Sequence, residues 1–311
     1  MATHRTSLAG CPPRLASTFS IVARDPRTRE LGVAVQSHYF SVGSAVPWAK
    51  YGVGAVATQS FVEIAYGPKG LDLMKRGVAP AEALRRLTAA DRRKAVRQIG
   101  IVDATGRSAA WTGSGCISHA GHVTGRNFSA QGNLLASPRV WEAMARTFQS
   151  RGGRLAERLV AALEAGQRAG GDARGTQSAS LLIVGPGTRG KPWTETKIDL
   201  RVEDHPAPIK EIGRLLGLFR AYELADTAER MFRTNRSRAL ASYDRAVALS
   251  PRNDELRFWH GGLLMRAGRT AAALAEVRRA IELNPRWKTL LPRLTPAHLP
   301  GVSEIRRRLR V

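Results

Sequence analysis

Hydrophobic and polar side chains alternate along the first patterned segment of the chain, residues 18–25 (TFSIVARD). Phe19, Ile21 and Ala23 fall on one face of an extended strand, and the residues between them fall on the other face. The residues that precede this segment show no such period. The pattern therefore predicts a β-strand that begins abruptly at Thr18, on a hydroxyl side chain.

The same patterns predict strands and pairs of helices in alternation along the first two thirds of the chain. The expected strands are 18–25, 31–39, 52–60, two within 96–113, at least one within 122–135, 178–185 and 194–204. The expected helices are 67–77, 79–91, 137–150 and 154–170. Runs of strands separated by helix pairs are not typical of βαβ units. We therefore predict an α+β fold, a four-layer αββα sandwich with helices on both outer faces.

A boundary is predicted at DHPAP (204–208), because its two prolines interrupt any regular element. The pattern beyond it is helical throughout. The expected domains are a leader or propeptide (1–17), the αββα domain (18–205) and a helical region (206–311).

Two near-copies in the helical region, AVALSP (246–251) and AIELNP (280–285), indicate an internal repeat. Their prolines, Pro251 and Pro285, are 34 residues apart, which is the tetratricopeptide period. Two such units are fewer than an independent solenoid normally needs. We therefore expect the region to pack on the main domain or on a second subunit, so that the protein forms a homo-oligomer.

Aromatic side chains in this region allow two interpretations. Phe258 and Leu263 fall in the register of a buried helix face. Trp259 and Trp287 are candidates for exposed anchors that bind a partner.

Charge raises the question of nucleic-acid binding, because the chain of 311 residues carries a net charge of +24. Residues 1–200 account for +14 of this charge and residues 201–311 for +10, so the excess is spread over both parts. The longest concentrated tract is RRRLR at 306–310. This distribution favours a cationic surface of general composition over a nucleic-acid site.

The N-terminus and the cysteines give little sign of export. SLAGC (7–11) matches the box that precedes a lipid-modified cysteine, but MATHRT supplies no apolar stretch before it. Cys11 and Cys116 make no disulfide framework. No run approaches the roughly 18 apolar residues of a membrane span. We expect a cytoplasmic protein without membrane contact, and no cofactor, since no phosphate-loop motif is present.

A hydroxyl at the head of the first strand of such a sandwich indicates one kind of chemistry. A threonine whose own α-amine is free can act as nucleophile and base together, because that amine titrates near neutrality. Thr18 is the first candidate and Ser17 the second. The mechanism requires the nucleophile to be the first residue of the mature chain, so residues 1–17 would be a propeptide or would follow a misassigned start codon. The structural alternative is that threonine and serine favour strand starts and turns.

Several segments together resemble a known family. They are TFSIVARD, LGVAVQSHYFSVGSAVPWAKYGVGAVATQSF, YGPKGLDL, AGHVTGRNFSAQGNLL and GGDARGTQSASLLIV. They are similar to domain-of-unknown-function family 1028, which is assigned to the N-terminal-nucleophile hydrolase-like fold. The resemblance covers residues 18–205 and implies amide-bond hydrolysis through an acyl-enzyme, without naming a substrate.

The resemblance implies roles for individual residues. Thr18 would attack a carbonyl, and Lys50, 32 residues later, would correspond to the lysine of proteasome-like members. Asn133 would donate to an oxyanion, helped by a backbone N–H near Gly132. The alternative for these last two residues is a tight turn, since both tolerate positive φ.

Further candidates come from the residues alone. His38 and Gln59 stand at strand ends, where sites gather, although His38 could equally cap a sheet edge. Arg174 could bind a substrate carboxylate or pair within the fold.

Cys116 is the other type of nucleophile in the sequence. It stands in TGSGCISHAGH near His119 and His122, which allows a thiol catalyst or, with weaker support, a metal site.

Two functions remain open at this point. The first is a hydrolase of a small or cyclic amide that uses Thr18. The second is a non-catalytic binding protein on the same fold, whose helical region mediates dimerisation or docks a partner.

Overall fold

The computed structural model describes residues 15–16 and 18–310. The chain divides into two compact units, the first extending to Gly213 and the second from Arg214 to Val311. Of the expected features, Cys11, Ser17 and most of the leader lie outside the described residues. Among the described residues, no helix has the length and apolar character that a membrane span requires.

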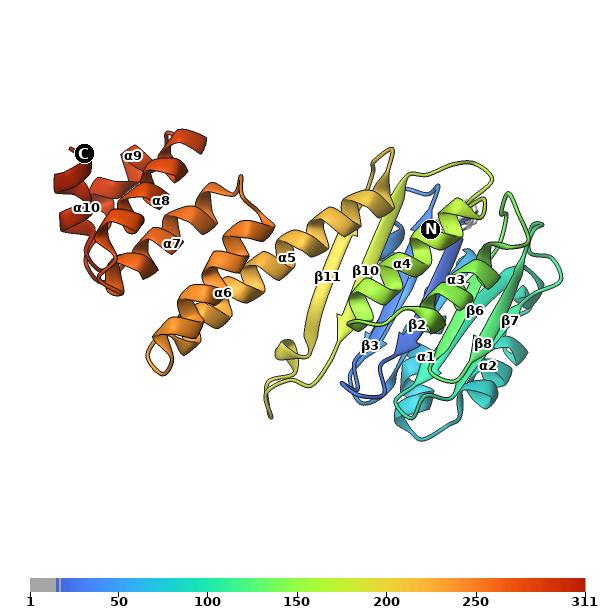
Figure 1. The fold of residues 1–311 in the computed structure, drawn as a ribbon. Coiled ribbons are helices and arrows are strands. Elements are labelled where there is room, and N and C mark those ends of the chain that lie inside the picture. Colours follow the sequence, from blue (N-terminus) through green and yellow to red (C-terminus); the bar gives the residue numbers. More distant parts are fainter. Residues whose placement is uncertain (1–14, 17, 311) are drawn as a thin grey trace, which may run out of the picture. The chain divides into compact units, whose positions relative to one another are not determined.

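The strands and helices follow the order expected from the sequence, and Figure 1 labels most of them. The strands are β1 (Leu15–Ala16), β2 (Thr18–Arg24), β3 (Leu31–Ser37), β4 (Pro47–Lys50), β5 (Gly54–Phe61), β6 (Arg97–Asp103), β7 (Ser108–Thr112), β8 (Gly121–Gly125), β9 (Phe128–Gly132), β10 (Ser178–Val184) and β11 (Thr196–Val202). The helices of at least eight residues are α1 (Tyr66–Lys75), α2 (Pro80–Ala89), α3 (Val140–Ser150), α4 (Leu155–Arg168), α5 (Pro208–Met231), α6 (Arg236–Leu249), α7 (Asp254–Arg266), α8 (Thr270–Leu283) and α10 (Val302–Leu309).

In the described residues of the first unit, the strands form two antiparallel sheets. Sheet A has the order β1-β5-β6-β7, with β4 also paired to β5, and sheet B has the order β11-β10-β3-β2-β9-β8. Strands β1 and β2 are consecutive in the chain but belong to different sheets, β1 to sheet A and β2 to sheet B.

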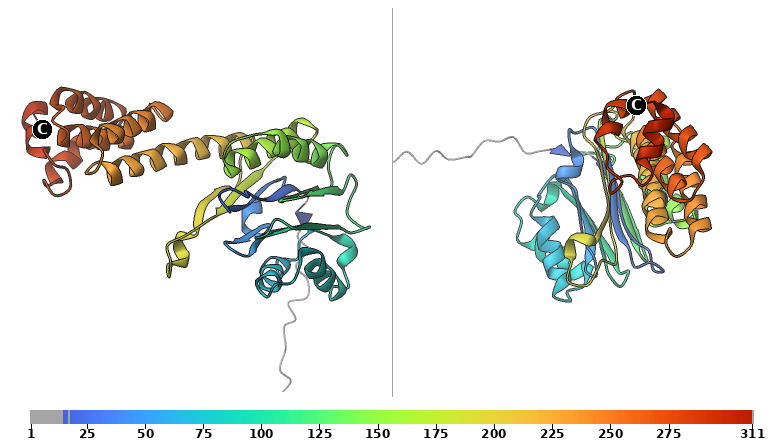
Figure 2. Two further views of the ribbon diagram at one scale, coloured as in Figure 1. Left: turned by 60° about the horizontal axis from the view of Figure 1, so that its bottom comes forward. Right: turned by 90° about the vertical axis from the view of Figure 1, so that its left-hand side faces the viewer.

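The two sheets lie face to face, and a helix pair covers each outer face. Helices α1 and α2 pack on sheet A, and α3 and α4 pack on sheet B, as Figure 1 and the left view of Figure 2 show. The fold is therefore α+β with the expected four layers, helices–sheet–sheet–helices.

Strand β2 shows how the alternating pattern produces these layers. Val22 belongs to the apolar cluster between the sheets, together with Val33 of sheet B and Val102 of sheet A. Phe19 faces the other way and lies against α4, because a Cβ on Gly166 would come within 3.2 Å of its ring. Both faces of β2 are thus buried, and its polar residues between the sheets must find partners there.

Two strands were not expected from the sequence. β4 is short and its residues are only partly buried or exposed, and β1 has two residues, so neither gives a clear period. Segment 122–135, expected to contain at least one strand, contributes β8 and β9, which form a hairpin.

The second unit is built from helices whose ends match the repeated sequence. The near-copies AVALSP and AIELNP form the C-terminal ends of α6 and α8. Side chains of Asn235 and Asn253 cap the N-termini of α6 and α7 by accepting hydrogen bonds from backbone N–H groups. Gly261 allows α7 and α8 to approach, because a Cβ there would lie 2.6 Å from Val277 Cγ2.

The two tryptophans proposed as exposed anchors pack inside this unit instead. The Trp287 ring stacks on Phe258 with centroids 4.0 Å apart, and its Nε1–H donates to Asp254 Oδ2 at 2.6 Å. The Trp259 ring meets Phe258 edge-on at 5.3 Å. These contacts leave both tryptophan residues only partly exposed, so neither is the exposed anchor expected from the sequence.

Helix α7 also carries a buried histidine that should make the protein sensitive to acid. His260 is 4% exposed and stacks on Tyr243, and burial lowers the pKa of its imidazole. A histidine with a lowered folded-state pKa is protonated first in the unfolded chain. The contribution of neutral His260 to the free energy of unfolding is therefore fully present above the ordinary histidine pKa of about 6.5. It decreases as the pH drops below that value.

We expect the free energy of unfolding in urea to fall as the pH is lowered from 7.5 to 5.5. His260 should account for at most about 1.4 kcal/mol of this fall per pH unit. His260→Phe keeps the ring stacking but cannot be protonated, so this part of the pH dependence should disappear. Urea titration followed by circular dichroism at 222 nm measures both chains. If the free energy of unfolding changed equally with pH in the parent chain and in the His260→Phe chain, the pH dependence would not come from His260.

Candidate functional site

A set of fully buried amide and hydroxyl side chains lies between the two sheets, at the end of the sandwich where β2 begins. We call it the polar layer; its members, all 0% exposed, are Ser20, Gln59, Gln98, Gln131 and Asn133. They come from β2 and β9 of sheet B, from the residue after β9, and from β5 and β6 of sheet A.

Gln98 is the centre of the polar layer. Its Oε1 accepts from Gln59 Nε2 at 2.7 Å and from Asn133 Nδ2 at 2.8 Å. Its Nε2 donates to the Gly132 carbonyl at 2.7 Å and to Thr112 Oγ1 at 2.9 Å. The buried Gln98 side chain of sheet A therefore connects the two sheets through its hydrogen bonds.

A second chain of hydrogen bonds runs deeper into the sandwich. Gln131 Nε2 donates to Ser20 Oγ at 2.7 Å, and Ser20 Oγ donates to Gln59 Oε1 at 2.6 Å. Gly100 leaves the space that Gln131 occupies, because a Cβ there would lie 2.2 Å from Gln131 Oε1. The sequence therefore needs glycine on one sheet for an amide of the other sheet to enter the core.

Thr18 lies at the edge of the polar layer. It is 0% exposed, and its Oγ1 donates to Ser37 Oγ at 3.3 Å. Its carbonyl accepts from the Asn133 backbone N–H at 3.0 Å and from Gln59 Nε2 at 3.2 Å. In the chain that includes residue 17, the Thr18 nitrogen is part of a peptide bond and is not an amine.

The predicted partners of Thr18 divide into two groups. Gln59, Gly132 and Asn133 are beside it, although the Asn133 amide donates to Gln98. Lys50 is not beside it. It is exposed and pairs with Gly54, at the end of β5 opposite Gln59. Five strand residues span about 16 Å. Lys50 therefore does not lie next to Thr18, contrary to what the resemblance implied.

His38 and Arg174 meet at Asp172, at the same end of sheet B. Asp172 Oδ2 accepts from the His38 backbone N–H at 3.0 Å and from the Arg174 guanidinium at 3.0 Å. Its Oδ1 accepts from the Arg174 backbone N–H at 2.9 Å. Arg174 thus pairs within the fold, the second of its two expected possibilities, while the His38 residue is exposed at the rim.

A cavity of about 480 Å³ borders the polar layer on the other side. Thr112, Cys116 and His122 are among its lining residues, and His122 Nδ1 lies 2.8 Å from Thr112 Oγ1. Although the His122 residue is exposed, desolvation of its ring lowers its pKa. Through Thr112 and Gln98, hydrogen bonds join this cavity to the polar layer.

Cys116 does not have the environment of a catalytic thiol. Its Sγ donates to the Arg97 carbonyl at 3.3 Å, and burial raises the pKa of the thiol. A raised pKa keeps the thiol protonated, and the thiolate is the nucleophilic form. No group of three His, Cys, Asp or Glu side chains in the described chain could hold a metal ion, so the expected alternative of a Cys116/His119/His122 site is not formed.

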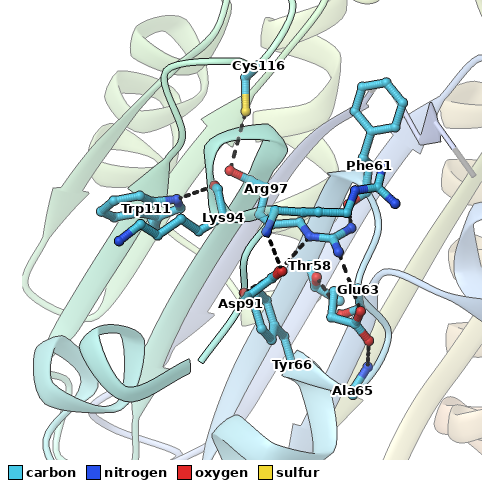
Figure 3. Close-up of polar contacts among 11 residues, drawn as sticks. Thr58, Phe61, Glu63, Ala65, Tyr66, Asp91, Lys94, Arg97, Trp111 and Cys116 are labelled. Carbon is cyan, nitrogen blue, oxygen red and sulfur yellow. Dashed lines mark hydrogen bonds and ion pairs between the residues drawn. The ribbon is translucent and has the colours of Figure 1, made fainter. Parts of the chain in front are cut away.

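Arg97 is the first residue of β6 and directly precedes Gln98, and Figure 3 shows its contacts with Asp91 and Glu63. Arg97 is 6% exposed. Its Nε–H donates to Asp91 Oδ2 at 2.8 Å, and a second guanidinium nitrogen lies 3.5 Å from Glu63 Oε2. Tyr66 donates to the same Asp91 oxygen at 2.8 Å. Burial opposes the ionised form of Asp91, but hydrogen bonds from Arg97 and other groups hold its pKa below the ordinary value.

Two of the described non-glycine residues with positive φ lie at this end of the sandwich. Ser60, at the end of β5, and Leu134, after β9, have positive φ angles of 71° and 50°. Such conformations are costly for residues with a side chain and occur most often at functional sites.

With this geometry in place, the chain can be compared with known proteins. A family model described as "Family of unknown function (DUF1028)" matches residues 18–212. The chain belongs to this family. The match begins at Thr18 and confirms the resemblance seen in the sequence.

A solved structure extends the DUF1028 assignment to three dimensions. The crystal structure of protein SPO2555 from Silicibacter pomeroyi, which bears the same family model, is similar to this chain with a TM-score of 0.59 and 32% sequence identity. The similarity covers 65% of this chain and 85% of that one. Among curated proteins, none matches the chain.

Sequence reasoning missed Gln98, Gln131, Ser20 and Thr112 in this DUF1028 chain. A signal for two of them was present, since Gln98 and Gln131 are long polar side chains next to apolar residues in strands that prove to be buried throughout. A polar side chain in such a strand needs a partner from another element. The identity of that partner depends on how the sheets pack.

Proposed function

We propose that this protein hydrolyses a small or cyclic amide, with Thr18 as the nucleophile of a chain that begins at that residue. One observation carries the proposal: Thr18 is fully buried, heads β2 and lies at the edge of the polar layer. A free α-amine would therefore arise on a threonine already held between the sheets. The family match from residue 18 onward supports the same starting point.

The chemistry uses groups of one residue. The Thr18 Oγ would attack the amide carbonyl carbon while its proton passes to the Thr18 α-amine. The tetrahedral intermediate would collapse by breaking the C–N bond, and the leaving amine would take that proton. Water would then hydrolyse the ester, release the carboxylic acid and return the hydroxyl proton to Thr18.

The surroundings favour a neutral substrate. The polar layer consists of amide and hydroxyl groups, which recognise uncharged donors and acceptors without an ion to desolvate. Gln59 and Asn133 hold the Thr18 carbonyl and so fix the position of the nucleophile. We assign them positioning roles, with His38 and the Asp172-bound Arg174 at the rim where a substrate would enter.

A second function is favoured by the burial of Thr18. In the chain that retains residues 15–16, β1 pairs with β5 and Thr18 has no exposed surface. A protein that keeps these residues would lack both the free amine and access to it. On this alternative, the fold is a non-catalytic binding protein and its helical unit supplies the docking surface.

Two measurements separate these functions. The intact mass of the purified protein should show that the active species begins at Thr18. A chain released from an N-terminal fusion with Thr18 first should hydrolyse members of a panel of linear and cyclic amides, whereas residues 1–311 kept intact should not. Equal activity of the two chains would overturn the proposed mechanism, and activity in neither would favour the binding protein.

A further inference from the structure

The helical unit contains a cavity that is independent of the Thr18 site. Its volume is about 410 Å³, and it is lined by residues of α5, α6 and α7 and by the segment 298–300 before α10. Its lining residues include three carboxylates and three aromatic rings.

Negative charge in this cavity exceeds positive charge, although the whole chain carries +24. Asp226, Glu229 and Glu255 all line it. Glu229 pairs with Arg266 at 2.7 Å, and Glu255 Oε2 accepts from the Tyr222 hydroxyl at 2.7 Å. Within the described residues, Asp226 has no ion pair, so three carboxylates face one arginine.

A largely buried tyrosine lines the cavity together with these carboxylates. Tyr243 is 3% exposed and lines the cavity, and in the described chain its hydroxyl makes no hydrogen bond. Burial raises the pKa of Tyr243, and the nearby charges of Glu229, Asp226 and Glu255 raise it further. Its ring is fixed by parallel stacking on His260, with centroids 5.0 Å apart. The Tyr243 side chain is thus fixed in the wall of the cavity, and its hydroxyl can donate to or accept from a ligand group there.

Aromatic faces complete the wall. Tyr222, Tyr243 and Trp259 all line the cavity beside the carboxylates. This combination of aromatic rings and carboxylates binds organic cations, because a ring face attracts positive charge and a carboxylate accepts its N–H groups. A divalent metal fits less well, since no group of described side chains is arranged to hold one.

We propose that this cavity binds an organic cation, an alkylguanidinium or alkylammonium group. The guanidinium would donate to Asp226 and Glu255 and to the Tyr243 oxygen, with its plane against an aromatic ring. Such a group is carried by an arginine or lysine side chain of a polypeptide and by small free amines.

The test uses the full chain and isothermal titration calorimetry. N-acetyl-arginine amide should bind at least about tenfold more tightly than N-acetyl-citrulline amide, its neutral isostere. N-acetyl-lysine amide should bind as well, and added salt should weaken both cationic probes. A heptapeptide with one central arginine that binds more tightly than the amide would identify a polypeptide as the source, and equal binding would identify a small amine.

Variants locate the binding. Asp226→Asn and Glu255→Gln alter exposed side chains, and each should weaken N-acetyl-arginine amide by roughly tenfold. Glu282→Gln removes an exposed carboxylate of the same unit that pairs with Arg279 outside the cavity, and should leave binding unchanged. Equal affinity for the arginine and citrulline amides, no binding of either cationic amide, or unchanged binding by both Asp226→Asn and Glu255→Gln would overturn the proposal. Circular dichroism of each variant verifies its fold.

Discussion

Replacing Thr18 by alanine in a chain that begins at residue 18 is expected to reduce amide hydrolysis by at least about a thousandfold. The substitution removes the Oγ that would form the acyl-enzyme and leaves the α-amine without a hydroxyl to activate. Thr18→Ser keeps both groups and should retain measurable activity. Rates on the best substrate of an amide panel, at saturating concentration, give the comparison.

The fold of the alanine variant needs its own control. Thr18 is fully buried and bonds to Ser37, so part of any effect could come from lost packing. Circular dichroism and the urea midpoint detect that loss. Thr124→Ala, at an exposed position of β8, is the matched control and should leave activity intact. If the Thr18→Ala chain remained folded and hydrolysed amides at the parental rate, Thr18 would not be the nucleophile.

Gln98→Leu is expected to lower the free energy of unfolding by about 3–5 kcal/mol. The leucine fills a similar volume but removes the acceptor for Gln59 and Asn133 and the donor for the Gly132 carbonyl. Buried polar groups that lose a partner in this way cost about 1–3 kcal/mol each. Total stabilities are commonly about 5–15 kcal/mol, so the variant should be close to unfolding.

Urea denaturation at neutral pH measures the Gln98 effect. Gln149→Leu makes the same change on the exposed surface of α3 and should stay within about 0.5 kcal/mol of the parent chain. A Gln98→Leu chain within about 1 kcal/mol of the parent would show that the polar layer can rearrange around an apolar side chain, contrary to the network described above.

Residues that are neighbours in space but distant in sequence could not be assigned from the pattern. Lys50 is one example. Its position 32 residues after Thr18 suggested that the two residues are close, but Lys50 pairs with Gly54, at the end of β5 far from Thr18. His38 is a second example, because its backbone N–H donates to Asp172, 134 residues later in the chain. Sequence spacing does not determine at which end of a strand a side chain lies.

The alternation of apolar and polar residues by itself determined most strands and helices, their order and the α+β class, because these depend on local periodicity. It also marked Thr18 as the abrupt start of β2. Only the tertiary structure decided what Thr18 touches. Strand register and the packing of two sheets bring Gln59 and Asn133 to it from distant places in the chain, and Gln98 connects those two side chains. These are long-range contacts, and their partners are selected by how the buried faces fit together and not by any local pattern.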